Sequence, residues 1–125
     1  MPANVELPIR LKPLFAAIDA KDTSRFVDHL SENAVFRFGS APPVHGRSAI
    51  ATAVTAFFDS IAGCRHAISS TWSSPGKFAC EGEVCYTRHD GSEITLPFVD
   101  VFELQGELIS GYRIYIDIAP LYTST

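Results

Sequence analysis

The chain has 125 residues, of which 46% are hydrophobic and 19% are charged, and its net charge at pH 7 is −4. This length predicts one domain, residues 1–125, with a core large enough to be stable without a metal or a disulfide. The acidic balance argues against nucleic acids and anionic membrane surfaces as partners, because both select basic proteins. The uncharged stretch 48–58 is shorter than the about 20 residues that a membrane-spanning helix needs.

The cysteines indicate a compartment. Cys64, Cys80 and Cys85 are an odd number, which is a poor basis for a disulfide framework. The first residues lack the basic segment and the apolar run of a secretory signal. We therefore expect a reducing cytoplasm, with the three thiols as small buried or half-buried side chains.

The N-terminal half has the pattern of three helices and one strand. Apolar residues between Leu7 and Ile18 recur at helical spacing, and this first helix starts or kinks at Pro13. Asp22 and Thr23 are good N-caps for a second, short helix. Residues 34–38 predict a strand, the following turn ends it, and a third helix runs from Gly46 towards residue 63.

From residue 64 onward the apolar period changes to two. We expect strands near 65–73, 77–88, 93–104 and 108–118, separated by turns rich in glycine, proline and aspartate. Helices followed by an antiparallel meander predict an α+β fold. Both faces of the last strand carry apolar or aromatic residues, and the helices can cover one face. We therefore expect a homodimer through the other face of the sheet.

Two carboxylates interrupt this pattern. Asp100 lies in an otherwise apolar row of its strand, and Asp117 shares a face with Arg113 and Tyr115. The strands are neighbours, so the acids could approach each other. At ~4 Å their repulsion of about 4 kcal/mol would raise one pKa by about three units. Either one acid holds a proton and the two form a general acid/base pair, or Arg113 lies between them and keeps both ionised as a fixed polar anchor.

Each of these residues also has a purely structural interpretation. Asp100 could be a buried acid that pairs with an arginine, Asp117 could be solvated at the rim of the sheet, and Arg113 could form a plain salt bridge. His66 shares a predicted face with Ile68, Ser70 and Trp72. It is either a hydrogen-bonded core residue or a group that titrates near the working pH.

Aromatic side chains are the expected walls of a pocket: Phe15, Phe36, Trp72, Tyr86, Phe98, Phe102 and Tyr115. Motifs for nucleotides, zinc proteases and serine hydrolases are missing from the sequence. We therefore expect no metal site and no cofactor.

Three segments carry a family resemblance. Residues 34–50, 97–102 and 112–117 resemble the strand–turn–helix and strand signatures of the nuclear-transport-factor-like superfamily, and most of all its SnoaL-like branch. The resemblance implies three helices packed on a strongly curved antiparallel sheet, a cystatin-like α+β barrel with a conical apolar pocket. It also implies a dimer through the convex face.

The superfamily includes isomerases, epoxide hydrolases, polyketide cyclases, dehydratases and binding modules, so fold alone does not define the activity. By resemblance, Asp100 matches the protonated strand acid of the isomerases and one acid of the epoxide hydrolases, whose second acid matches Asp117. The isomerase tyrosine corresponds to Leu14, and an arginine of the epoxide hydrolases corresponds to Phe98. These departures disfavour steroid-type isomerisation and weaken the epoxide-hydrolase interpretation.

The sequence is compatible with two classes of function, an enzyme and a binding module. In the first, a cofactor-free enzyme binds a small hydrophobic molecule, Asp100 is the general acid/base with Asp117 or His66 assisting, and Arg113 sets their charge. In the second, the same groups orient a ligand in a non-catalytic module. A third possibility, a structural dimerisation domain, requires the cone to be filled by side chains.

Overall fold

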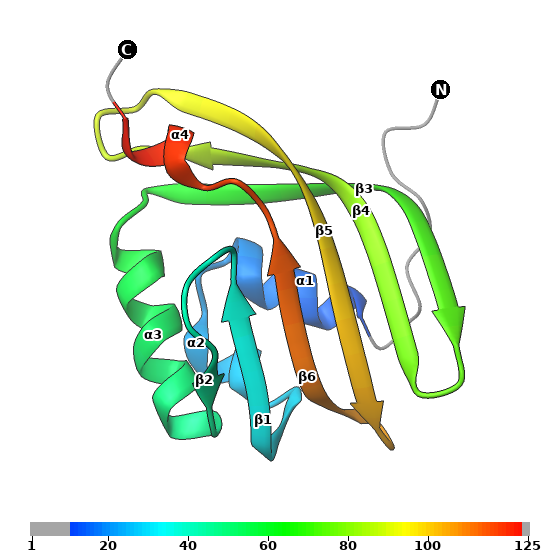
Figure 1. Ribbon diagram of the computed structural model, residues 1–125. Coiled ribbons are helices and arrows are strands. Elements are labelled where there is room, and N and C mark those ends of the chain that lie inside the picture. Colours follow the sequence, from blue (N-terminus) through cyan, green and yellow to red (C-terminus); the bar gives the residue numbers. More distant parts are fainter. Residues whose placement is uncertain (1–10, 124–125) are drawn as a thin grey trace.

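The computed structural model describes residues 11–123 (Figure 1). Its elements, in chain order, are α1 (Lys12–Asp19), α2 (Thr23–Val27), β1 (Leu30–Phe38), β2 (Val44–His45), α3 (Arg47–Asp59), β3 (Gly63–Ser74), β4 (Lys77–Thr87), β5 (Glu93–Gln105), β6 (Leu108–Tyr115) and α4 (Ala119–Tyr122). The predicted α+β class is confirmed. The last predicted strand ends earlier than expected, and α4 follows it.

Local sequence accounts for the starts of the helices. Pro13 lies in the first turn of α1, where its missing N–H costs nothing, so the helix starts there instead of kinking. Asp22 caps α2, since its Oδ1 accepts a hydrogen bond from the Arg25 backbone N–H at 3.1 Å. Leu7, predicted on the first helix, lies outside the described residues.

Within residues 11–123, six strands form one sheet in the order β2-β1-β6-β5-β4-β3. Strands β3 to β6 are the predicted antiparallel meander. The expectation of a wholly antiparallel sheet is wrong for one pair, because β1 runs parallel to β6. Parallel neighbours need a long connection, and here α3 and four strands lie between them in the chain.

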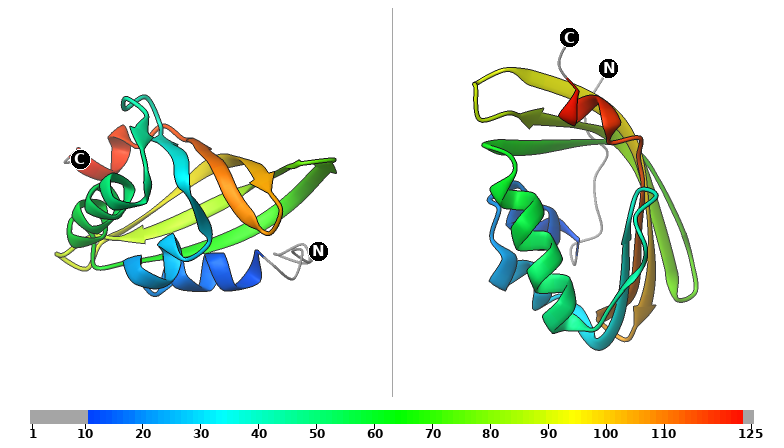
Figure 2. Two further views of the ribbon diagram at one scale, coloured as in Figure 1. Left: turned by 90° about the horizontal axis from the view of Figure 1, so that it is seen from below. Right: turned by 60° about the vertical axis from the view of Figure 1, so that its left-hand side comes forward.

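The sheet is strongly curved but does not close into a barrel (Figure 2). Helices α1, α2 and α3 lie on its concave side, and the core forms between them and the sheet. Among the described residues, no helix covers the convex side. None of the helices there has the length and apolar run of a membrane span.

Two β-bulges change which side chains face the core. In β3 the pairing with β4 shifts between Ile68 and Ser70, which leaves Ser69 as an extra residue. In β6 the pairing with β5 shifts after Ile109, which leaves Ser110 as an extra residue. One extra residue moves every later side chain to the opposite face of a strand.

Candidate functional site

A cavity of about 440 Å³ lies between the concave face of the sheet and the helices. Its walls are mainly aromatic and aliphatic, and no lysine or arginine is among the described residues that line it. Asp100, His66 and Cys64 are among the polar groups in the wall. A cavity of this size and composition is typical of a binding site for a small organic molecule. It also argues against a purely structural domain with a filled cone.

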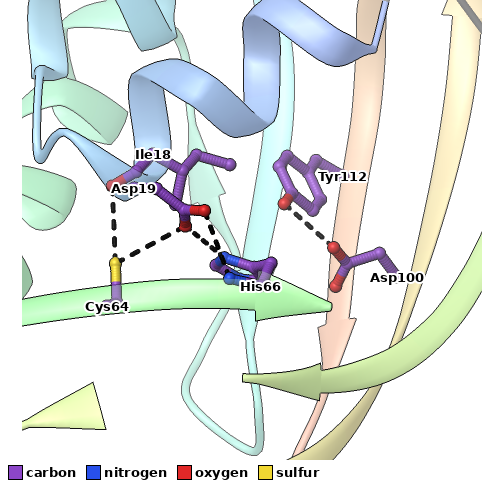
Figure 3. A network of polar contacts seen from close by, with 6 residues as sticks. All are labelled: Ile18, Asp19, Cys64, His66, Asp100 and Tyr112. Carbon is purple, nitrogen blue, oxygen red and sulfur yellow. Dashed lines mark hydrogen bonds and ion pairs between the residues drawn. The ribbon is translucent and has the colours of Figure 1, made fainter. Parts of the chain in front are cut away.

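Asp100 on β5 is the buried acid of this cavity. It is 1% exposed, and its Oδ2 accepts a hydrogen bond from the Tyr112 hydroxyl at 3.1 Å (Figure 3). Its Oδ1 is buried and has no hydrogen-bond partner among the described residues. Burial raises the pKa of Asp100 to about 8, although the bond from Tyr112 acts in the other direction. At neutral pH the carboxyl is therefore protonated and can donate a hydrogen bond to a ligand.

Tyr112 on β6 is held in place by aromatic packing. Its ring lies 4.4 Å from that of Phe102 and 5.5 Å from that of Phe36, measured between centroids. Burial and the nearby Asp100 raise the pKa of the Tyr112 phenol well above its ordinary value. The phenol therefore remains a donor, which leaves the proton of Asp100 free for the cavity.

His66 on β3 forms a second polar group with Asp19 at the end of α1. Its ring Nδ1 is 2.6 Å from Asp19 Oδ1, and its backbone N–H donates to Asp19 Oδ2 at 3.2 Å (Figure 3). A carboxylate accepts hydrogen bonds, so Nδ1 carries the hydrogen and Nε2 keeps a lone pair. The ring packs between Phe15 and Phe98, at centroid distances of 5.2 and 5.3 Å.

Cys64 completes this cluster. Its Sγ lies 3.4 Å from the carbonyl oxygen of Ile18 and 3.9 Å from Asp19 Oδ1. Ligand atoms of Asp19, Cys64 and His66 all lie within 4.8 Å of one another, and such a donor set can coordinate zinc. Hydrogen bonds already join the three groups, however, and burial raises the pKa of the Cys64 thiol to about 12. Both features favour a hydrogen-bonded cluster with a protonated, inert thiol.

Arg113 and Asp117 do not join Asp100, and the predicted convergence of these residues is wrong. The bulge at Ser110 pairs Asp100 with Ile114 and places Arg113 opposite Val101, on the other face of the sheet. Arg113 there donates to Glu103 Oε1 at 2.7 Å. Asp117 lies exposed beyond the end of β6 and accepts a hydrogen bond from the Ala119 N–H at 3.2 Å.

The predicted aromatic wall divides into three groups. Phe36, Tyr86 and Phe98 line the cavity, and Phe15 and Phe102 are buried behind it. Trp72 and Tyr115 are 53% and 55% exposed and lie on the convex face. The bulge at Ser69 puts Trp72 opposite Ala79, so it no longer shares the face of His66.

Comparison with known proteins identifies the family. The profile of the SnoaL-like domain matches residues 11–112. The chain belongs to the SnoaL-like family. The sequence has no significant match among curated proteins.

Solved structures of SnoaL-like and related proteins share the fold. An NTF2-like protein of unknown function from Burkholderia pseudomallei superposes with a TM-score of 0.80 at 17% identity, over 90% of this chain and 91% of that one. A putative polyketide cyclase from Xanthomonas campestris gives 0.76 at 17% identity, over 90% of both chains. A hypothetical protein with a ketosteroid isomerase-like fold from Catenulispora acidiphila, in complex with trimethylamine, gives 0.80 at 12% identity, over 88% of this chain and 86% of that one. At these identities the likeness is one of fold.

Sequence reasoning missed two residues of this SnoaL-like site. Asp19 is 47 positions from His66 in the chain, and nothing in the local pattern of α1 distinguishes it from a solvated acid at a helix end. The sequence did contain a signal that Tyr112 belongs to the site, because Tyr112 lies on the apolar face of the last strand together with Ile114. A register that included the bulge would have placed its hydroxyl near Asp100.

Proposed function

We propose that this SnoaL-like protein is a cofactor-free enzyme that transfers a proton on a small, uncharged, largely apolar molecule. In this proposal Asp100 is the acid, and His66, oriented by Asp19, is the base. One observation carries the proposal: the buried Asp100 carboxyl, with its pKa near 8 and an unpartnered Oδ1, lies in the wall of a cavity that His66 also lines. The fold shared with a putative polyketide cyclase and with a protein of ketosteroid isomerase-like fold is compatible with this class of function.

The character of the cavity supports an uncharged substrate. Because the described lining residues include no lysine or arginine, an anionic group would be desolvated there without a cationic partner. A protonated Asp100 supplies a hydrogen-bond donor, which suits a carbonyl or hydroxyl oxygen. A small cyclic ketone satisfies both requirements.

The proposed step balances within the site. Nε2 of His66 removes a proton from the carbon beside the carbonyl. The electron pair of the broken C–H bond then forms the new C=C bond, and the electrons of the carbonyl π bond move to the oxygen. Asp100 stabilises the negative charge that develops on the oxygen by donating its hydrogen bond. Return of the proton to the same or another carbon regenerates both groups. Proton transfer requires a placed acid and a placed base and no further reagent.

Deuterium exchange tests the proposal directly. We expect the wild-type protein to accelerate exchange of the α-protons of 2-tetralone, an uncharged bicyclic ketone, in deuterated buffer followed by NMR. Asp100→Asn and His66→Gln should each lower the acceleration by about 10²-fold or more, the contribution typical of an acid or a base. Asp19→Asn should lower the rate and shift its pH profile while leaving binding of the ketone intact.

Glu103→Gln is the matched control, because Glu103 lies on the same strand but is paired with Arg113 on the convex face. It should exchange at the wild-type rate. Binding of the ketone with no acceleration in the wild type would contradict the enzyme and favour the alternative, a non-catalytic ligand-binding module.

We also propose that the protein is a homodimer through the convex face and that it resides in a reducing cytoplasm. The exposed Trp72 and Tyr115 support the first statement. The free thiols of Cys64, Cys80 and Cys85 support the second.

A further inference from the structure

The C-terminal segment, residues 118–122, forms one part of the cavity wall. Ile118 and Tyr122 line the cavity, and Leu121 between them is buried. This segment follows β6 and contains α4, which has four residues. An isolated helix of that length has no stability of its own. Its position therefore depends on contacts with the rest of the protein.

Arg88, outside the cavity, supplies the main polar contacts to this segment. Its Nε donates to the carbonyl oxygen of Leu121 at 2.9 Å, and its Nη2 donates to that of Pro120 at 2.9 Å. Its Nη1 donates to Ser92 Oγ at 3.1 Å. All three guanidinium nitrogens are thus engaged, and the planar fork of an arginine is required to make these bonds together.

The turn that carries Arg88 is itself rigid. Asp90 Oδ1 accepts hydrogen bonds from the backbone N–H and the hydroxyl of Ser92, at 2.9 and 2.6 Å. The neighbouring His89 ring lies 2.8 Å from the carbonyl oxygen of Asp59 at the end of α3. The turn between β4 and β5 is therefore a firm support to which α4 is attached by the two bonds from Arg88.

The walls formed by the sheet and by α3 have less freedom to move. Strands β1 and β3 to β6 are joined by backbone hydrogen bonds along their lengths, interrupted only at the bulges, and α3 buries Ile50, Val54 and Phe58. The turn after β1 is tied to the sheet by the Gly39 N–H, which donates to the Ile114 carbonyl at 2.8 Å. Residues 118–122 make no strand pairing, and Tyr122 is 58% exposed. Segments with few such bonds open most easily.

We propose that Arg88 is a positioning residue that holds residues 118–122 as the movable wall of the cavity, through which the ligand enters and leaves. The proposal rests on the proposed function in that the cavity takes a ligand. Release of the two carbonyls from Arg88 lets the segment swing away from the turn. The wall then opens more often, and the cavity itself keeps its shape.

Stopped-flow binding of N-phenyl-1-naphthylamine, an uncharged dye that fluoresces in apolar sites, tests this role. In Arg88→Ala we expect the association and dissociation rates to rise together by about ten-fold, the effect of losing one to two hydrogen bonds. The dissociation constant should stay within about two-fold of that of the wild type, because the lining is unchanged. Arg88→Lys should restore the rates in part, since an ammonium cannot make the forked contact. Arg65→Ala removes the same charge from the exposed Arg65–Glu93 pair and should behave as the wild type.

Hydrogen–deuterium exchange of the same variants gives a readout that needs no ligand. Exchange in residues 118–122 should be faster in Arg88→Ala and unchanged in the sheet. Unchanged exchange in residues 118–122 of Arg88→Ala would overturn the proposal. A higher dissociation rate of the dye with an unchanged association rate would also overturn it, because a fixed wall gives that result. A wild-type protein that fails to bind the dye would contradict the proposed function, and the exchange data would still decide the role of Arg88.

Discussion

Asp100 shows at the scale of one residue how a site can work against stability. A carboxyl in this apolar cavity is desolvated, and its pKa near 8 lies above the value of about 4 in an unfolded chain. Between these two pH values the folded protein keeps a proton that the unfolded chain releases. The contribution of Asp100 to stability is therefore highest below pH 4, falls as the pH rises to 8, and is level above it. The total loss is on the order of 5 kcal/mol.

Asp100→Asn should remove this dependence, because an amide does not titrate. We expect the variant to gain stability relative to the wild type as the pH rises from 4.5 to 9, by a few kcal/mol. Urea unfolding at pH 4.5, 7 and 9 measures the difference. Glu107→Gln, at an exposed turn position, should follow the wild-type profile. Parallel profiles for wild type and Asp100→Asn would show that the carboxyl is ionised in the folded protein.

At the scale of the element, the two bulges decide which side chains meet. Ser69 lies opposite the gap between Glu81 and Gly82, and the backbone of β3 there comes close to β4. A Cβ at position 82 would overlap the carbonyl oxygen of Ala67, and only glycine permits this approach. The bulge keeps His66 and Ile68 on the concave face while it turns Trp72 to the convex one.

Gly82→Ala should therefore destabilise the protein by about 3 kcal/mol or more, since the backbone has to move. Gly63→Ala is the matched control on the neighbouring strand, where an added Cβ would meet the side chain of Thr87 at an ordinary 3.9 Å. We expect it to change stability by less than about 1 kcal/mol. Chemical denaturation of both variants gives the comparison, and equal effects would rule out a special role for position 82.

At the scale of the whole molecule, the convex face is the uncovered surface of the sheet. The pairing places Trp72, Ala79, Val101 and Arg113 in one row across the strands, and Ser70, Glu81, Val99 and Tyr115 in the next row. Their apolar and aromatic members form a strip, bordered by Arg113 and Glu81, of the kind that marks a protein–protein interface. A second copy could bury the strip by a two-fold arrangement of identical faces.

The double substitution Trp72→Glu and Tyr115→Glu should convert the proposed dimer into a monomer, because it places four like charges in one interface. Sedimentation equilibrium measures the mass. Leu108→Glu adds one negative charge at the exposed first residue of β6 and should leave the dimer intact. A monomeric wild-type protein at micromolar concentration would refute the proposed interface.

The sequence alone predicts the kinds and order of most elements, because apolar periodicity, caps and turn residues act locally. The 3.6-residue period around Leu14 marks a helix, and the alternation around Asp100 marks a strand and shows that the acid points towards the core. The SnoaL-like resemblance was likewise carried by short local segments. These features do not depend on what the chain contacts elsewhere.

The tertiary structure alone decides which groups share the cavity. Simple counting back from the turn at residues 106–107 pairs Asp100 with Arg113, and the extra residue at Ser110 replaces that partner by Ile114. The contact between Asp19 and His66 joins residues 47 positions apart, and the partner of β1 is the last strand of the chain. A bulge or a long-range contact is selected by the packing of the whole core, to which each local segment contributes a small part.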